Sequence, residues 1–160
     1  MRRAGFVLVP SRTATADENV ELHNPEAVPP VFLPTRSWKA GRFILNVTNI
    51  ATDSGDTVDV YLQSGTRRPN AGGIIWDDFI HFTQVAGNAS EPVQHIAVWQ
   101  RDGQTPESEM HVPQTDDISS GAVIQGPLGE YFRMRTIVAD SGDGNSTVTY
   151  EIFAEIEEDA

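Results

Sequence analysis

The sequence predicts an all-β protein, an antiparallel two-sheet β-sandwich of the jelly-roll or immunoglobulin-like type with an extended N-terminal arm. Apolar and polar residues alternate along most of the chain after residue 41, and β-branched and aromatic residues fill the apolar positions, as half-buried sheets require. No long window carries an apolar stripe with helical spacing. A chain of 160 residues is large enough for one domain with its own core.

The first element is the arm, predicted at 1–40, ahead of a sandwich domain at 41–160. Prolines at positions 10, 25, 29, 30 and 34 disfavour a helix or a central strand here. The segment also carries residues of a buried type, which indicates an ordered arm lying on a partner rather than a flexible tail. The predicted partner contacts are Arg2, Arg3, Phe6, Val20, Leu22, Val31, Phe32 and Trp38.

The strands of the sandwich follow from period-two patterns. In 42–50, Phe43, Leu45 and Val47 share one face, and the same alternation recurs in 57–64, 130–138 and 147–158. The segments 74–85 and 92–100 are less regular but apolar, so Trp76 and Trp99 are expected in the core. Shorter candidate strands lie at 6–9, 110–112 and 122–125.

The tetrapeptide Asp-Ser-Gly-Asp occurs twice, at 53–56 and at 140–143, each time between two predicted strands. Asp and Gly favour turns, so both copies predict tight connections, and the flanking strands predict two related hairpins. Asp53, Asp56, Asp140 and Asp143 are also hard oxygen ligands, and a calcium site is the alternative. Because the calcium-loop spacing is missing, the structural turn is favoured and no metal is predicted.

The net charge of −12 is unevenly spread along the chain. Residues 1–45 hold six Lys and Arg against four Asp and Glu, whereas residues 46–160 hold five against nineteen. An acidic body repels phosphates, so no nucleic-acid partner is expected. The basic leading segment fits docking onto an acidic surface, and solubilising charge is the alternative. No apolar run approaches the roughly 20 residues of a membrane helix, so no membrane partner is expected.

The sequence shows no motif of an enzyme. His23, His81, His95 and His111 stand alone without metal-ligand spacing, and no nucleophile elbow or phosphate loop occurs. The chain has no cysteine, so thiolate chemistry is excluded. Neighbouring carboxylates such as those at 77–78 point to opposite faces of a strand and cannot share a substrate, whereas a glycosidase dyad built from carboxylates distant in the sequence stays open. A non-enzymatic protein without a cofactor is therefore predicted.

Aromatic residues suggest a second kind of function, sugar binding. An exposed aromatic platform would bind glycans, and Tyr61, on the polar side of its predicted strand, is the expected exposed aromatic residue.

The stretch 58–88 resembles small β-sandwich proteins of tailed-phage virions, and the segment 130–156 is similar to the closing strands of that group. Together they cover about 60 residues of the chain. The loop "GTRRPNAGG" is longer and more basic than in that group, so Arg67 and Arg68 are candidate exposed contacts. The positions that carry the resemblance in 58–88 are Asp59, Val60, Leu62, Gln63, Ser64, Gly72, Gly73, Trp76, Asp78, Phe82, Thr83, Gln84, Val85 and Gly87.

The resemblance implies a structural component of a virion, made in the host cytoplasm and placed on the head surface. The expected function is that of a capsid decoration (cement) protein whose arm and subunit contacts stabilise the shell. The expected partners are the major capsid protein and copies of the chain itself, as a homotrimer. A minor tail protein, or a carbohydrate-binding or host-adhesion module of a tail or fibre, is the alternative.

Overall fold

The computed structural model describes residues 2–24, 31–32, 37–67, 72–89, 92–103, 118–129, 131–142, 144 and 146–159. The described residues contain no α-helix and are dominated by strands, which confirms the predicted all-β class. The strands are β1 (Arg2–Ala14), β2 (Glu18–Glu21), β3 (His23–Asn24), β4 (Val31–Phe32), β5 (Trp38–Ala51), β6 (Thr57–Arg67), β7 (Ile74–His81), β8 (Val85–Ala86), β9 (Val93–Gln100), β10 (Tyr131–Ala139) and β11 (Thr147–Glu158).

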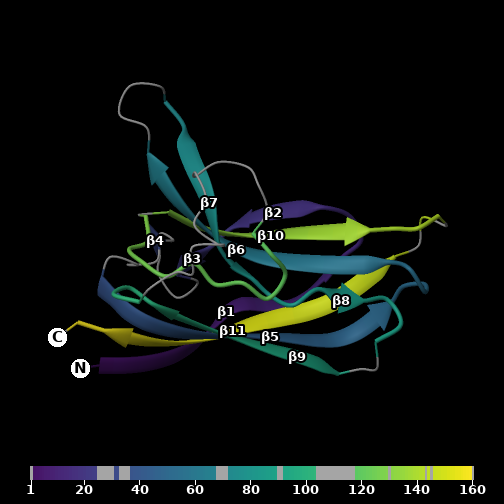
Figure 1. Ribbon diagram of the computed structural model, residues 1–160, viewed down its shortest axis with the longest axis horizontal. Helices are drawn as coiled ribbons and strands as arrows, with labels where there is room; N and C mark the ends of the chain where they lie inside the picture. The colour runs from purple at the N-terminus through teal and green to yellow at the C-terminus, as the bar shows by residue number, and fades with distance from the viewer. Residues whose placement is uncertain are drawn as a thin grey trace.

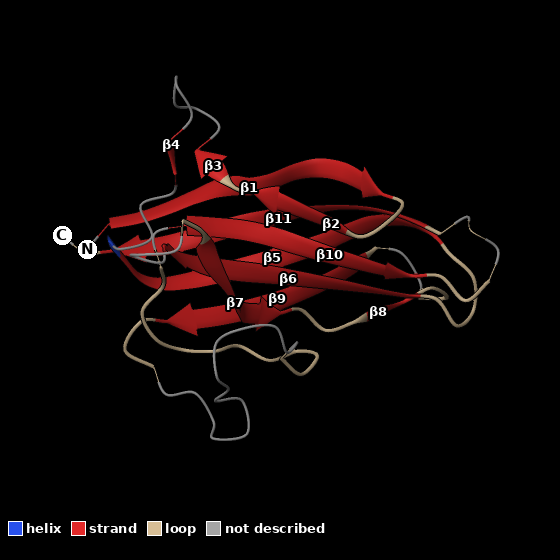
Figure 2. Ribbon diagram, turned by 90° about the horizontal axis from the view of Figure 1, so that it is seen from above, coloured by secondary structure: helices blue, strands red, loops and turns tan. Residues whose placement is uncertain are grey.

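Two antiparallel sheets pack against each other, so the predicted sandwich is also confirmed. Sheet A has the order β1-β11-β5-β9, and sheet B has the order β2-β10-β6-β7, with β8 paired to the first residues of β6. The short strands β3 and β4 pair with each other in a separate two-stranded sheet. Sheet B lies above sheet A in Figure 1, and most strands of both sheets run along one long axis in Figure 2.

The two predicted hairpins are wrong, because each Asp-Ser-Gly-Asp connection crosses from one sheet to the other. The strand β5 belongs to sheet A and β6 to sheet B, and likewise β11 belongs to sheet A and β10 to sheet B. The pairs that form are β5 with β11 and β6 with β10. The two strand–turn–strand units therefore lie side by side, and their connections meet at one end of the sandwich (Figure 1).

The predicted boundary at residue 40 does not separate an arm from the sandwich. The segment 2–14 pairs with β11 at the edge of sheet A, and 18–21 pairs with β10 at the edge of sheet B. Pro10 is compatible with this position because an edge strand has one side without a ladder partner, and the register shifts on both sides of Val9. The proline pattern excluded a central strand but not an edge strand.

The core between the sheets is rich in aromatic rings. Phe132 is 5.7 Å from Trp38 and 5.2 Å from Phe79, measured between ring centroids, and all three side chains are buried. Trp99 is fully buried as predicted, but Trp76 is only half-buried, so its predicted core position is wrong. Trp76 instead lies beneath Arg133 of β10, at 4.3 Å from the guanidinium carbon to the ring centroid.

Candidate functional site

The two Asp-Ser-Gly-Asp copies are joined through the side chain of Asp56. One carboxylate oxygen of Asp56 accepts hydrogen bonds from the backbone N–H and the hydroxyl of Ser141, at 2.7 and 2.6 Å. The other oxygen accepts from the hydroxyl of Ser146 at 2.6 Å and from the N–H of Asp53 at 2.9 Å. These hydrogen bonds, led by that from the Ser141 hydroxyl, hold the pKa of Asp56 well below its usual range. The side chain ties the first cross-sheet connection to the second.

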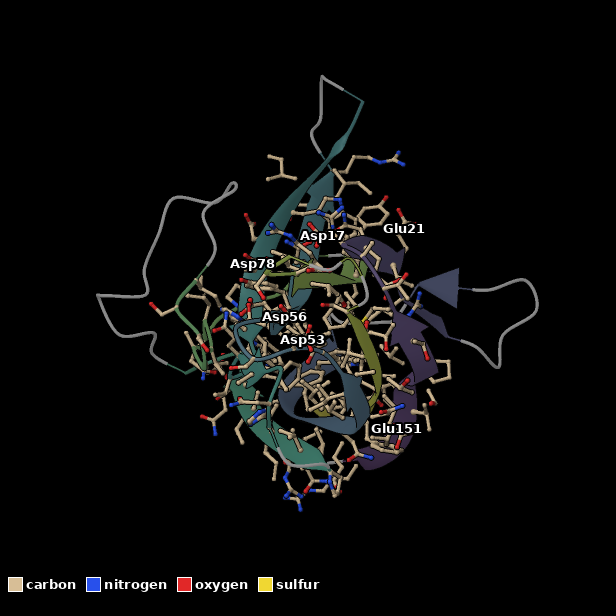
Figure 3. All side chains as sticks on the ribbon, turned by 90° about the vertical axis from the view of Figure 1, so that its right-hand side faces the viewer. Asp17, Glu21, Asp53, Asp56, Asp78 and Glu151 are labelled. Atoms are coloured by element: carbon tan, nitrogen blue, oxygen red, sulfur yellow. The ribbon has the colours of Figure 1, made fainter. Side chains whose placement is uncertain are left out.

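This arrangement bears on the calcium alternative. Both carboxylate oxygens of Asp56 accept hydrogen bonds from N–H and O–H groups. A carboxylate that binds calcium would instead face the cation together with other oxygen ligands, so this arrangement argues against Asp56 as a calcium ligand. Asp140 accepts a hydrogen bond from the N–H of Gly142, and Asp143 lies outside the described residues. Within the described part of the chain, no three His, Asp or Glu side chains gather as metal ligands. Figure 3 shows Asp53 and Asp56 together near the middle of this end of the sandwich.

The outer face of sheet B carries a polar array covered by aromatic and arginine side chains. Arg133 lies opposite Gln63, which lies opposite Asp78, and the Gln63 amide joins the two by accepting from Arg133 and donating to Asp78. The neighbouring cross-strand row contains Arg135, Tyr61 and His81, with the Arg135 guanidinium 5.3 Å from the Tyr61 ring. The side-chain amide of Gln63 thus has both its oxygen and its nitrogen hydrogen-bonded within the sheet.

At the edge of this array, at the end of β7, His81 holds the loop 118–124 against sheet B. Its Nε2 lies 2.7 Å from Asp59 Oδ1, and its Nδ1 lies 2.8 Å from the carbonyl oxygen of Ile118. The backbone of His81 also bonds that loop, donating to the Ala122 carbonyl and accepting from the Gly121 N–H. A carbonyl and an ionised carboxylate both accept, so this geometry satisfies both ring nitrogens of His81 when each carries a proton, which is the imidazolium form.

The pKa shifts of His81 and Asp59 both favour the charged forms of these two side chains. Burial lowers the pKa of His81, but the hydrogen bonds to Asp59 and Ile118 outweigh it, and the pKa is raised above its ordinary value. Burial raises the pKa of Asp59, but the hydrogen bonds from His81 and Gln84 outweigh it, and the pKa is lowered. Because both ring nitrogens are occupied, His81 as arranged holds structure and is not positioned to take a proton from a substrate.

The outer face of sheet A is of a different kind, because it carries an apolar row across all four strands. The register places Val7 of β1 opposite Phe153 of β11, Phe153 opposite Ile44 of β5, and Ile44 opposite Ile96 of β9. Their neighbours along each strand point into the core, so these four side chains point outward. Val7 is 41% exposed and Ile96 49% exposed. We call these four residues the apolar row.

Polar and small residues lie beside the apolar row. The next row along the strands contains Gly5, Glu155, Arg42 and Val98, and Val98 is 52% exposed. Arg42 and Glu155 form an exposed ion pair at 3.3 Å. A shallow hollow of about 440 Å³ lies here, where Gly5 has no side chain to fill it. Three apolar side chains of this face are thus far more exposed than those of the core.

Of the five predicted arm contacts whose side chains the structure describes, four lie in or against the core of the sandwich, which corrects their role. Leu22 and Trp38 are core residues, 4% and 1% exposed, and Phe6 and Val20 pack against the core. Arg3 is exposed and pairs with Glu157 at 3.5 Å. Of Arg2, Val31 and Phe32 only the backbone is described, as parts of β1 and β4.

The expectation that Tyr61 is exposed is also wrong, because the side chain is 3% exposed. Its ring stacks on His81 with the ring centroids 4.0 Å apart, and Arg135 covers it. Arg67 is exposed as predicted and lies 6.0 Å from the Tyr131 ring, whereas Arg68 falls outside the described residues.

Sequence reasoning missed the apolar row. Each strand contributes one apolar residue to the row, at an outward position where a polar residue is expected. In the sequence each of these residues therefore looks like a single exception to the alternation of apolar and polar residues. A signal was present: Ile44, Ile96 and Phe153 are large apolar residues on the side of a strand that should be polar. Only the register brings them together.

Comparisons of the chain with protein-family models, with curated proteins and with solved structures found no significant match. Among the described residues there is no helix with the length and apolar character needed to cross a bilayer.

Proposed function

We propose that the chain is a non-enzymatic structural protein of a tailed-phage virion, a decoration protein that binds the outer shell of the head and stabilises it by contact. The resemblance of 58–88 and 130–156 to small β-sandwich proteins of tailed-phage virions is the reason to propose a virion as the assembly that contains this chain. The observation that carries the proposal is the apolar row on sheet A, because a contiguous apolar stripe beside charged residues on an exposed sheet face is typical of a site for contact with another protein.

The proposal moves the contact surface from the expected arm to the outer face of sheet A. Leu22 and Trp38 were expected to contact the shell as parts of an arm. Both are buried in the core, so they cannot also contact a partner. Val7, Ile96 and Val98 are exposed and remain available for contact. The major capsid protein and other copies of this chain are the proposed partners.

The test is the copy number in purified particles of the phage that encodes the chain, measured by quantitative mass spectrometry. A decoration protein is present in hundreds of copies, whereas a tail or fibre protein is present in a handful. Particles stripped of the chain should rebind the purified protein and regain resistance to heat. A chain absent from particles, or present in a few copies, overturns the proposal.

A glycan-binding module was expected to need an exposed Tyr61, and the burial of this residue removes the observation that favoured it. A glycan array probed with the purified chain tests this directly, since specific retention of a sugar would favour the adhesion function over the one proposed.

A further inference from the structure

We propose that the outer face of sheet A binds a second copy of this chain, face to face, about a two-fold axis that runs along the strands between β5 and β11. This inference rests on the proposed function and narrows it, because of the two partners proposed there it assigns a second copy of the chain, and not the major capsid protein, to the outer face of sheet A. It replaces the homotrimer expected from the sequence with a two-fold pair.

The order of sheet A makes such a contact self-complementary. A two-fold axis between the two central strands of β1-β11-β5-β9 places β11 against β5 of the partner, and β1 against the partner's β9. The apolar row then faces itself. Phe153 meets the partner's Ile44, and Val7 meets the partner's Ile96, so every member of the row covers an apolar side chain.

The adjoining row is complementary under the same rotation. Glu155 meets the partner's Arg42, so the two ion pairs of the two copies stack with opposite charges in contact. Val98, the most exposed large apolar side chain among the described residues, meets the partner's Gly5, where the hollow has room for it. The protruding side chain of Val98 therefore faces a glycine of the partner, which has no side chain to clash with it.

The charges also select this axis over the other in-plane two-fold. A rotation about the apolar row itself would place β11 on β11, and Glu155 would then face the partner's Glu151. Like charges in direct contact are unfavourable, and no cation of the same strand would offset them. The axis along the strands is the one that pairs opposite charges.

The size of the face fits a stable pair. Strands of 8 to 14 residues make up sheet A. At about 3.3 Å per residue and about 4.8 Å between strands they give a face of about 700 Å². Specific interfaces bury roughly 800 Å² per partner, so the face is close to standard size without any further segment. Aligned sheets packed face to face lie about 10 Å apart, which leaves room for interdigitating side chains.

The first experiment uses cysteine cross-linking, for which a chain without native cysteine is well suited. Val7 and Ile96 lie on the two edge strands of sheet A, three strand spacings or about 14 Å apart, too far for a disulfide within one chain. The double variant Val7→Cys, Ile96→Cys should form a covalent dimer under mild oxidation. Each single variant is the matched control and should stay uncross-linked, because each cysteine faces the other position of the partner.

The second experiment measures association of the full chain by sedimentation velocity from about 1 to 100 µM. Ile96→Lys should weaken the dimer at least about tenfold, and Asn19→Lys, an exposed position on sheet B, should not. Glu155→Arg should weaken it, and adding Arg42→Glu should restore it, since the double exchange keeps opposite charges in contact.

The outcomes separate this inference from the proposed function. A wild-type chain that is monomeric over this range, or single cysteine variants that cross-link as fast as the double variant, overturns the two-fold pair. If that monomer still rebinds stripped particles, the virion proposal stands and the face binds a shell protein instead. A specific dimer of a chain that is absent from particles overturns the virion proposal alone.

Discussion

Replacing His81 with Gln should remove a pH-dependent part of the stability of the sandwich. The folded pKa of His81 is raised, so its contribution is fully present below its unfolded pKa of about 6.5 and is lost as the pH rises through the folded value. The folded pKa of Asp59 is lowered, so its contribution is present above its unfolded pKa of about 3.9 and is lost as the pH falls through the folded value. The benefit of the pair is therefore greatest between about pH 4 and pH 6.5.

The magnitude follows from the two hydrogen bonds of the buried ring. A hydrogen bond to a charged group contributes about 1.5–3 kcal/mol. A Gln side chain can still donate to Asp59 but cannot also reach the Ile118 carbonyl on the opposite side, so one bond and the positive charge are lost. We expect His81→Gln to lower the free energy of unfolding by about 1.5–3 kcal/mol near pH 5.5, and by less once the pH exceeds the raised folded pKa of His81.

Urea unfolding of the wild type and of His81→Gln, at intervals from pH 4.5 to pH 9, gives the difference curve. His95 is half-buried and burial lowers its pKa, but it is present in both proteins and its titration cancels in the difference. An NMR titration of the His81 ring gives the folded pKa independently. A difference that does not change with pH, or that grows toward high pH, would refute an imidazolium bonded to both Asp59 and Ile118.

Three further substitutions test the interior and the connections. Tyr150→Phe removes a hydroxyl that bonds across the core to β10 and should cost about 1–2 kcal/mol in urea unfolding; an unchanged midpoint would contradict a cross-sheet bond. Asp56→Asn presents an amide to hydroxyl donors, so its urea midpoint should fall below that of the matched variant Asp140→Asn, and equal midpoints would argue against the link between the two connections. Gly129→Ala would drive a methyl group into the carbonyl of Gly65 and should cost about 1–3 kcal/mol in thermal unfolding; a wild-type melting curve would show that this close approach is absent.

The sequence predicted the long strands after residue 41 because period two is a local property. The candidate strand at 122–125 is wrong, since this segment is a loop with an isolated bridge at Val123, and the candidate at 110–112 lies outside the described residues. The alternation in 57–64 or 147–158 depends only on one buried face, and strands β6 and β11 cover these segments. The sequence could not predict which strands pair with each other. Two strands joined by a hairpin and two strands joined by a connection between sheets show the same alternation of apolar and polar residues. The two Asp-Ser-Gly-Asp copies were recognised as turns, but their relation through Asp56 depends on residues about 85 positions apart.

The surroundings of Tyr61, of Trp38 and of the apolar row could not be predicted either, because they depend on residues far away in the sequence. Tyr61 stands on the polar side of its strand, and nothing local indicates that Arg135 and His81 cover its ring. Trp38 reads as part of a proline-rich arm, yet it packs on Phe43 at 6.2 Å between ring centroids. The apolar row joins residues from positions 7 to 153, and only the register of sheet A brings them together.

The most direct measurement is a cryo-EM map of the assembled particle, with the position and orientation of this chain resolved. We expect repeated copies on the head surface in which Ile44, Ile96 and Phe153 lie buried against another protein surface. A map in which the chain is absent, or in which the outer face of sheet A points into solvent, would contradict it.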